Sequence, residues 1–135
     1  MTDRTALHAA ARGGDADAMV ELALLLEGGI TGDEEDGDPH AEVERWLGQA
    51  ARAGNLRGVA ELGAFLWHVR QDEQAALPWL TRAADGGDAG AMAVLGDVHD
   101  FLGDTDLARR WYGAAAALGD AGAAANLAAL NRLIN

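Results

Sequence analysis

The stretch from Trp79 to Gly96, WLTRAADGGDAGAMAVLG, decides the fold of this chain, because its pattern recurs along the sequence. Trp46 and Trp111 open the same phrase, and a degenerate copy without the tryptophan begins at Ala6. Each copy continues with a pair of alanines and ends in glycine followed by Asp or Asn. The aligned glycines are Gly14, Gly54, Gly87 and Gly119, which are 40, 33 and 32 residues apart. A period of this size indicates an array of structural repeats.

A second phrase follows each glycine, as in Ala91, Met92, Leu95 and Gly96 of the third copy. Small or apolar residues at offsets of three and four mark one face of a helix. Glycine takes the left-handed conformation that closes the preceding helix. The residue after it, which is Asp15, Asn55, Asp88 or Asp120, is expected to cap the next helix. The small residues predict close helix crossings.

The pattern predicts an all-α fold of about eight helices, with no strand. We expect them at residues 4–12, 16–28, 41–53, 56–69, 74–85, 89–102, 106–118 and 121–134. Trp46, Trp79 and Trp111 are interpreted as core residues that fill space beside the small ones. Pro78 would break a helix interior, so its helix should start late, near Ala75, or bend.

The sequence resembles the Sel-1-like repeat, a relative of the tetratricopeptide repeat. Two patterns carry the resemblance: the phrase from Ala91 to Leu95-Gly96, and the pattern Trp-x-x-x-Ala-Ala-x-x-Gly. The resemblance covers nearly the whole chain. It implies one domain over residues 1–135, a right-handed α-solenoid of antiparallel helix pairs. It also implies an adaptor that binds proteins or peptides without catalysis. The chain departs from the family at the end of each first helix, where Leu26, Leu66, His99 and Asn131 replace the usual aromatic residue.

Composition excludes several function classes. The 135 residues include no Cys, Lys or Ser, which removes the Ser and Cys nucleophiles, the Schiff-base lysine and the P-loop lysine. The formal charge of −12 argues against nucleic-acid binding, which requires basic surfaces. No signal peptide or membrane span is evident, so we expect a cytoplasmic protein if the sequence begins at its native start.

The first full repeat contains an acidic inserted loop at about residues 28–39, which makes this repeat seven residues longer than the next by the glycine spacing (40 − 33 = 7). An EF-hand loop needs an acidic residue at its first position, a glycine at its sixth and a glutamate at its twelfth. If Gly37 is the sixth position, Gly32 is the first and Val43 is the twelfth, so the segment does not match the calcium-binding motif. His8, His40, His68 and His99 include no pair at the i, i+4 spacing of a helical zinc site. We therefore expect a solvated loop, no metal site and no cofactor.

The first helix of each pair should line a concave face that binds a partner. Residues beside its packing stripe are the candidate site: Leu24, Glu27, Arg57, Trp67, His68, Asp97, Asp100 and Phe101. Trp67 lies outside the repeating tryptophan register, so it either is a binding anchor or covers the neighbouring helix or the insertion. Asp97 and Asp100 beside the aromatic residues would suit a peptide that carries Arg or Lys.

Two functions remain open. The first is a non-catalytic scaffold that binds a basic or mixed peptide, or a partner helix, on its concave face. The alternative is an acidic inhibitor, such as an antitoxin, an immunity protein or a nucleic-acid mimic, whose binding would weaken steeply with salt. A homodimer through the apolar helix at 121–134, which carries Leu127, Leu130, Leu133 and Ile134, is a further hypothesis.

Overall fold

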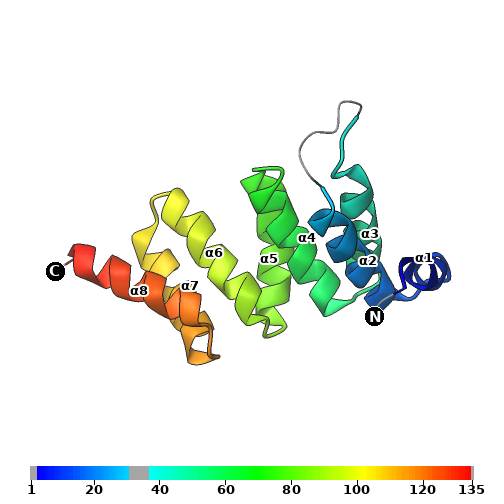
Figure 1. Ribbon diagram of the computed structural model, residues 1–135. Helices are drawn as coiled ribbons and strands as arrows, with labels where there is room; N and C mark the ends of the chain where they lie inside the picture. Colours follow the sequence, from blue (N-terminus) through cyan, green and yellow to red (C-terminus); the bar gives the residue numbers. More distant parts are fainter. Residues whose placement is uncertain (1–2, 31–36, 135) are drawn as a thin grey trace. The chain divides into compact units, whose positions relative to one another are not determined.

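The computed structural model describes residues 3–30 and 37–134, and the side chain of residue 134 lies outside that description. Eight helices and no strand occur in these ranges, which confirms the all-α prediction (Figure 1). They are α1 (Arg4–Arg12), α2 (Ala16–Gly28), α3 (Ala41–Arg52), α4 (Leu56–His68), α5 (Glu73–Asp85), α6 (Ala89–Phe101), α7 (Thr105–Ala117) and α8 (Ala121–Ile134). The predicted ends differ from these by no more than one residue.

The turns form as the Gly–Asp pattern predicts. Positive φ angles of 97°, 84°, 92° and 98° occur at Gly14, Gly54, Gly87 and Gly119. The next side chain caps the following helix in every repeat: Asp15 accepts from Ala18 N, Asn55 from Gly58 N, Asp88 from Ala91 N and Asp120 from Ala123 N. Local chemistry therefore sets where four of the helices begin.

Pro78 lies inside a helix. Asp72 accepts a hydrogen bond from Ala75 N at 3.1 Å, and this cap starts α5 at Glu73. The expectation of a late start near Ala75 is therefore wrong. The helix continues through Pro78, whose side chain is exposed.

The chain forms two compact units, Met1–Leu62 and Gly63–Asn135, each with its own packing. In the first unit, α2 packs against both α1 and α3. In the second unit, α6 packs against α5 and α7, and α7 packs against α8. A single repeat domain over residues 1–135 stays a prediction.

The core is aliphatic. In the first unit Leu22 and Leu47 are fully buried, and in the second unit Leu80 and Leu95 are fully buried. Of the three repeating tryptophans, Trp46 is 6% exposed and belongs to the core, as expected. Trp79 and Trp111 are only half-buried, so the core prediction fails in part for these two. The next residue along the helix, Leu80 or Tyr112, is the buried one in those copies.

Glycine permits the close approach of neighbouring helices. A Cβ atom at Gly58 would lie 2.8 Å from Ala50 Cβ, and one at Gly63 would lie 2.8 Å from Leu80 Cδ2. At Gly96 the same atom would overlap the ring of Tyr112. The interpretation of these small residues as crossing points is confirmed.

Candidate functional site

An aromatic pair lies on the surface of the second unit. The rings of Trp67 and Phe101 meet edge to face, with centroids 5.4 Å apart and planes at 69°. Trp67 is half-buried near the end of α4, whereas Phe101, the last residue of α6, is 71% exposed. Together with Gln71 and Glu73 they line a pocket of about 440 Å³. This group is called the aromatic pocket below.

The turn between α4 and α5 shapes one wall of the aromatic pocket. Asp72 N donates to Leu66 O at 3.0 Å, and Gln71 directly before it has a φ of 54°. In the turn between α6 and α7, the corresponding residue is Gly103, which has a φ of 84° and precedes the capping residue Asp104. A glutamine in the left-handed region costs about 1–2 kcal/mol relative to a favourable backbone. Gln71 is the only non-glycine residue in the described ranges with a positive φ.

The charged residue in the lining of the aromatic pocket is negative. Glu73 supplies a half-buried carboxylate to its wall, and Asp100, next to Phe101, is exposed. No basic side chain is among the four lining residues. The arrangement can therefore hold an apolar or cationic group more readily than an anionic one.

Asp97 has a role within the fold. Its Oδ1 accepts a hydrogen bond from Tyr112 Oη over 2.5 Å, linking α6 to α7. Burial raises the pKa of Tyr112, and the hydrogen bond to Asp97 and the nearby charges of Asp97 and Asp100 raise it further. Sequence reasoning placed Asp97 at a partner surface and missed this pair. The available signal was a tyrosine at an aligned core position, because a buried tyrosine hydroxyl needs a partner.

The other predicted site residues are dispersed. In the first unit, half-buried Leu24 lines a separate hollow of about 380 Å³ with Leu7, Glu21 and Leu25. Neither Glu27, which is half-buried, nor Arg57, which is exposed, is among its lining residues. In the second unit His68 is exposed beside Trp67 but does not line the aromatic pocket. One binding surface that joins all these residues stays a prediction.

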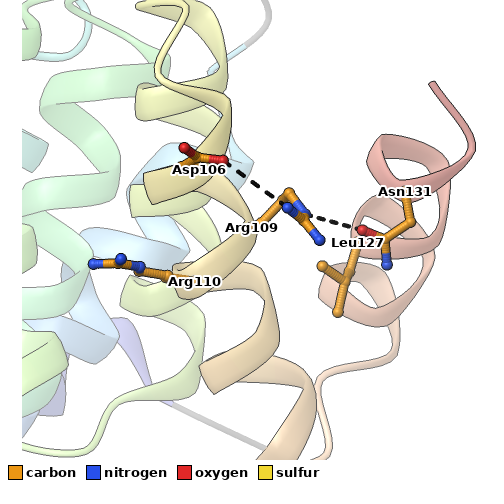
Figure 2. A pocket seen from close by; sticks show the side chains of 5 residues that line it. All are labelled: Asp106, Arg109, Arg110, Leu127 and Asn131. Atoms are coloured by element: carbon orange, nitrogen blue, oxygen red, sulfur yellow. Dashed lines mark hydrogen bonds and ion pairs between the residues drawn. The ribbon is translucent and has the colours of Figure 1, made fainter. Parts of the chain in front are cut away.

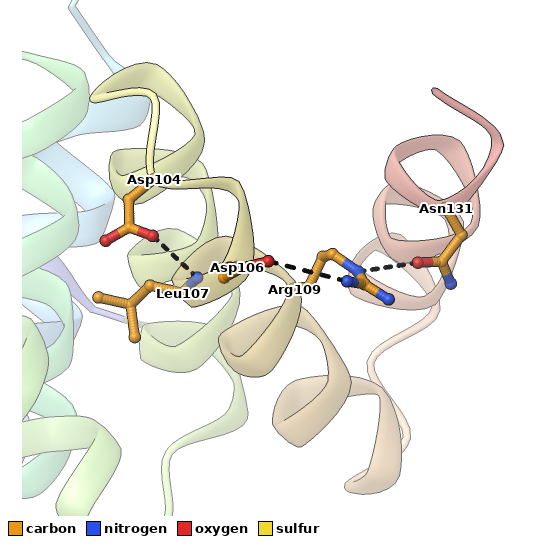
Figure 3. A network of polar contacts seen from close by, with 5 residues as sticks. All are labelled: Asp104, Asp106, Leu107, Arg109 and Asn131. Atoms are coloured by element: carbon orange, nitrogen blue, oxygen red, sulfur yellow. Dashed lines mark hydrogen bonds and ion pairs between the residues drawn. The ribbon is translucent and has the colours of Figure 1, made fainter. Parts of the chain in front are cut away.

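A third hollow of about 590 Å³ lies between α7 and α8 (Figure 2). Arg109 Nε donates to Asn131 Oδ1 at 3.0 Å, and an Arg109 terminal nitrogen lies 3.9 Å from Asp106 Oδ1 (Figure 3). Arg110 extends away from this network (Figure 2). Since Arg109 already has two partners, we interpret its main role as tying α8 to α7.

The acidic residues and the histidines are the candidate metal ligands of this chain. No cluster of three or more His, Cys, Asp or Glu side chains is placed there to hold a metal ion. Most of the acidic stretch that motivated the EF-hand comparison, residues 31–36, lies outside the described residues. His99 is half-buried. Within the same ranges no helix has the length and apolar character needed to cross a membrane.

Repeated helix pairs, capped Gly–Asp turns and glycine crossings define an all-α solenoid repeat protein. Among solved structures, a Sel1 repeat protein from Oxalobacter formigenes is 33% identical to this chain. The similarity covers 91% of this chain and 95% of that one, with a TM-score of 0.66. The chain belongs to the Sel1 repeat family.

Other solved structures share the fold. The protective antigen c5321 of uropathogenic Escherichia coli, which has an SLR fold, is 29% identical with a TM-score of 0.79. That similarity covers 92% of this chain but only 27% of the antigen. The immunity protein Pa5087 of Pseudomonas aeruginosa is 20% identical with a TM-score of 0.51, over 90% of this chain and 59% of that one, and shows the fold alone. No protein-family model and no curated protein matches the sequence.

Proposed function

We propose that this protein is a non-catalytic scaffold that binds a protein or peptide partner. Membership of the Sel1 repeat family supports a protein-interaction role. The sequence adds that several common catalytic groups, the Ser, Cys and Lys nucleophiles, are absent.

The observation that carries the proposal is the exposure of Phe101. Phe101 is 71% exposed although its ring contacts Trp67 and it borders a pocket. Aromatic side chains at a pocket are frequent anchors of protein interfaces because they bury a large apolar area when a partner docks. In the proposal Trp67 is part of the anchor, because its ring contacts Phe101 and also lines the pocket.

The remaining candidates surround this anchor or extend the surface. Asp100 supplies exposed negative charge beside Phe101, and His68 is exposed beside Trp67. Asp97 contributes charge while it holds Tyr112. In the proposal, the residues of the first unit, Leu24, Glu27 and Arg57, contact more distant parts of the partner.

A second candidate function is an acidic inhibitor of a basic target. The formal charge of −12 favours it, because such a surface attracts cationic proteins at long range. The fold shared with an immunity protein shows that such a protein can use this architecture. This candidate predicts binding through the whole acidic surface, with no dependence on any one aromatic side chain.

Affinity capture from a lysate of the source organism, followed by binding of the purified partner, tests both candidates. Wild type is compared with Phe101→Ala and with the matched control Leu118→Ala, which removes a side chain that is 57% exposed elsewhere in the second unit. A scaffold loses its partner in Phe101→Ala alone and keeps binding at moderate salt. For an acidic inhibitor, salt releases the partner, and wild type and the two variants bind the partner with equal affinity.

A further inference from the structure

We infer that the aromatic pocket receives an arginine side chain from the partner. This inference rests on the proposed scaffold function and names the chemistry that the pocket recognises. It follows from the ring geometry, from the charge of the lining residues and from the way this chain treats its own arginines.

The pocket offers aromatic surface together with a carboxylate. The Trp67 and Phe101 rings meet at 69°, so they form two walls of different orientation rather than a stacked pair. Glu73 lines the same pocket. A guanidinium group is planar and is attracted to the face of an aromatic ring, while its N–H fork matches a carboxylate. Lysine lacks the flat surface that stacks on a ring.

The chain stacks its own arginines on aromatic rings elsewhere. The guanidinium carbon of Arg70 lies 5.3 Å from the centre of Phe65, that of Arg82 lies 6.0 Å from Trp79, and that of Arg45 lies 5.8 Å from Trp46. Within the described residues, neither Trp67 nor Phe101 is paired with an arginine in this way. The aromatic pocket is therefore the place where an arginine from outside the chain completes a contact of the same kind.

Charge selects a cation over a neutral apolar side chain. The protein has 22 acidic and 10 basic side chains, and none of the four described residues that line the aromatic pocket is basic. Trp67 and Phe101 lie at the C-terminal ends of α4 and α6, where the helix dipoles favour positive charge, and the carboxylate of Glu73 offsets the opposite dipole at the start of α5. An arginine at this position would satisfy Glu73 and cover the exposed ring of Phe101 at the same time.

Gln71 adds a polar contact at the edge of the pocket. Its backbone is held at a φ of 54°, a conformation in which glycine is more stable, and its side chain lines the pocket. A strained residue at a binding wall often has a functional reason. The amide oxygen of Gln71 can accept one N–H of the guanidinium while Glu73 accepts others.

The test is titration of the full chain, labelled with ¹⁵N, by NMR. The probe is a short glycine–serine peptide with one central arginine, and its matched forms carry citrulline, lysine or leucine instead. Citrulline keeps the planar shape of arginine and removes only the charge. The indole signal of Trp67 is identified among the four tryptophans by comparison with Trp67→Phe.

We expect the arginine peptide to shift the Trp67 indole signal and the amide signals of Gln71, Glu73 and Phe101. It should bind at least about fivefold more tightly than the citrulline peptide. Phe101→Ala and Glu73→Gln should each weaken the binding of the arginine peptide at least about threefold. The control Asp85→Asn, which removes an exposed carboxylate at the other end of α5, should change it less than twofold. Far-UV circular dichroism confirms that each variant keeps its helices.

Equal affinity for the arginine and citrulline peptides would overturn the inference, as would shifts outside the aromatic pocket or no binding at millimolar peptide. A different result decides whether the scaffold proposal fails. If Phe101→Ala loses the captured partner while the arginine peptide does not bind, the aromatic pocket binds protein but its occupant is not arginine.

Discussion

The hydroxyl of Tyr112 donates to Asp97 across 2.5 Å and thereby joins the helices α7 and α6. Tyr112 is 2% exposed, and it is the only tyrosine in a chain that has no lysine and no cysteine. No other side chain therefore titrates near pH 10, where an unperturbed tyrosine ionises. Alkaline titration of this protein reports on a single contact.

The first prediction concerns that titration. Because the folded state raises the pKa of Tyr112, the stability from this group is complete below about pH 10 and is lost as pH rises further. Absorbance of tyrosinate should show a midpoint clearly above 10 in the folded protein. Urea unfolding should show stability falling above pH 10 in wild type. Tyr112→Phe should lower the free energy of unfolding by about 1.5–3 kcal/mol at pH 7. Its stability should then depend less on pH above pH 10 than that of wild type. A tyrosinate midpoint at 10 would refute the buried pair.

The second prediction compares two glycines. A Cβ at Gly96 would overlap the ring of Tyr112, whereas nothing lies within 4 Å of one at Gly113. Gly96→Ala should therefore destabilise the protein by about 1–3 kcal/mol through overpacking. Gly113→Ala should stabilise it by about 0.5–1 kcal/mol, because alanine is the better helix residue. Chemical denaturation measures both, and equal effects of the two substitutions would contradict the packing described here.

The third prediction concerns the backbone of Gln71. Gln71→Gly should stabilise the fold by about 1 kcal/mol, because glycine adopts a positive φ without strain. Gly103→Ala places a side chain in the same conformation and should destabilise the fold by about 1 kcal/mol. Thermal unfolding of the two variants beside wild type provides the comparison. A loss of stability in Gln71→Gly would show that the side chain of Gln71 matters more to the fold than its backbone strain.

The fourth prediction concerns the last helix. Arg109 donates to Asn131, so Asn131→Ala should lower amide protection in α8 about two- to tenfold in hydrogen exchange. Asn126→Ala is the matched control, since Asn126 is exposed on the same helix. Similar exchange in both variants would mean that the Arg109–Asn131 bond does not hold α8.

Most of the fold could be predicted because its signals are local. Gly87 followed by Asp88 specifies a left-handed turn and a cap from two residues alone, and both form. The same pair recurs in each repeat, so an error in one copy is corrected by the others. This redundancy explains why the helix ends were placed to within one residue.

The unpredicted features depend on contacts between helices or on a single exceptional residue. The position of Gln71 before the cap Asp72 matches that of Gly103 before Asp104, but glutamine rarely takes a positive φ. Glu73 precedes the helix expected at residues 74–85 and was not a candidate, whereas the structure places it in the first turn of α5 and in the wall of the aromatic pocket. Trp67 and Phe101 were selected from the sequence, whereas their contact is visible only in three dimensions.

The most direct test of the scaffold account is site-specific photocrosslinking in cells of the source organism. A photoreactive phenylalanine analogue replaces Phe101 in one form and Leu118, another exposed apolar residue of the second unit, in the control. The account predicts one dominant protein adduct at position 101, absent at 118, that disappears when Trp67→Ala is added. Equal adducts at both positions, or none at 101, would contradict a partner anchored at the aromatic pocket.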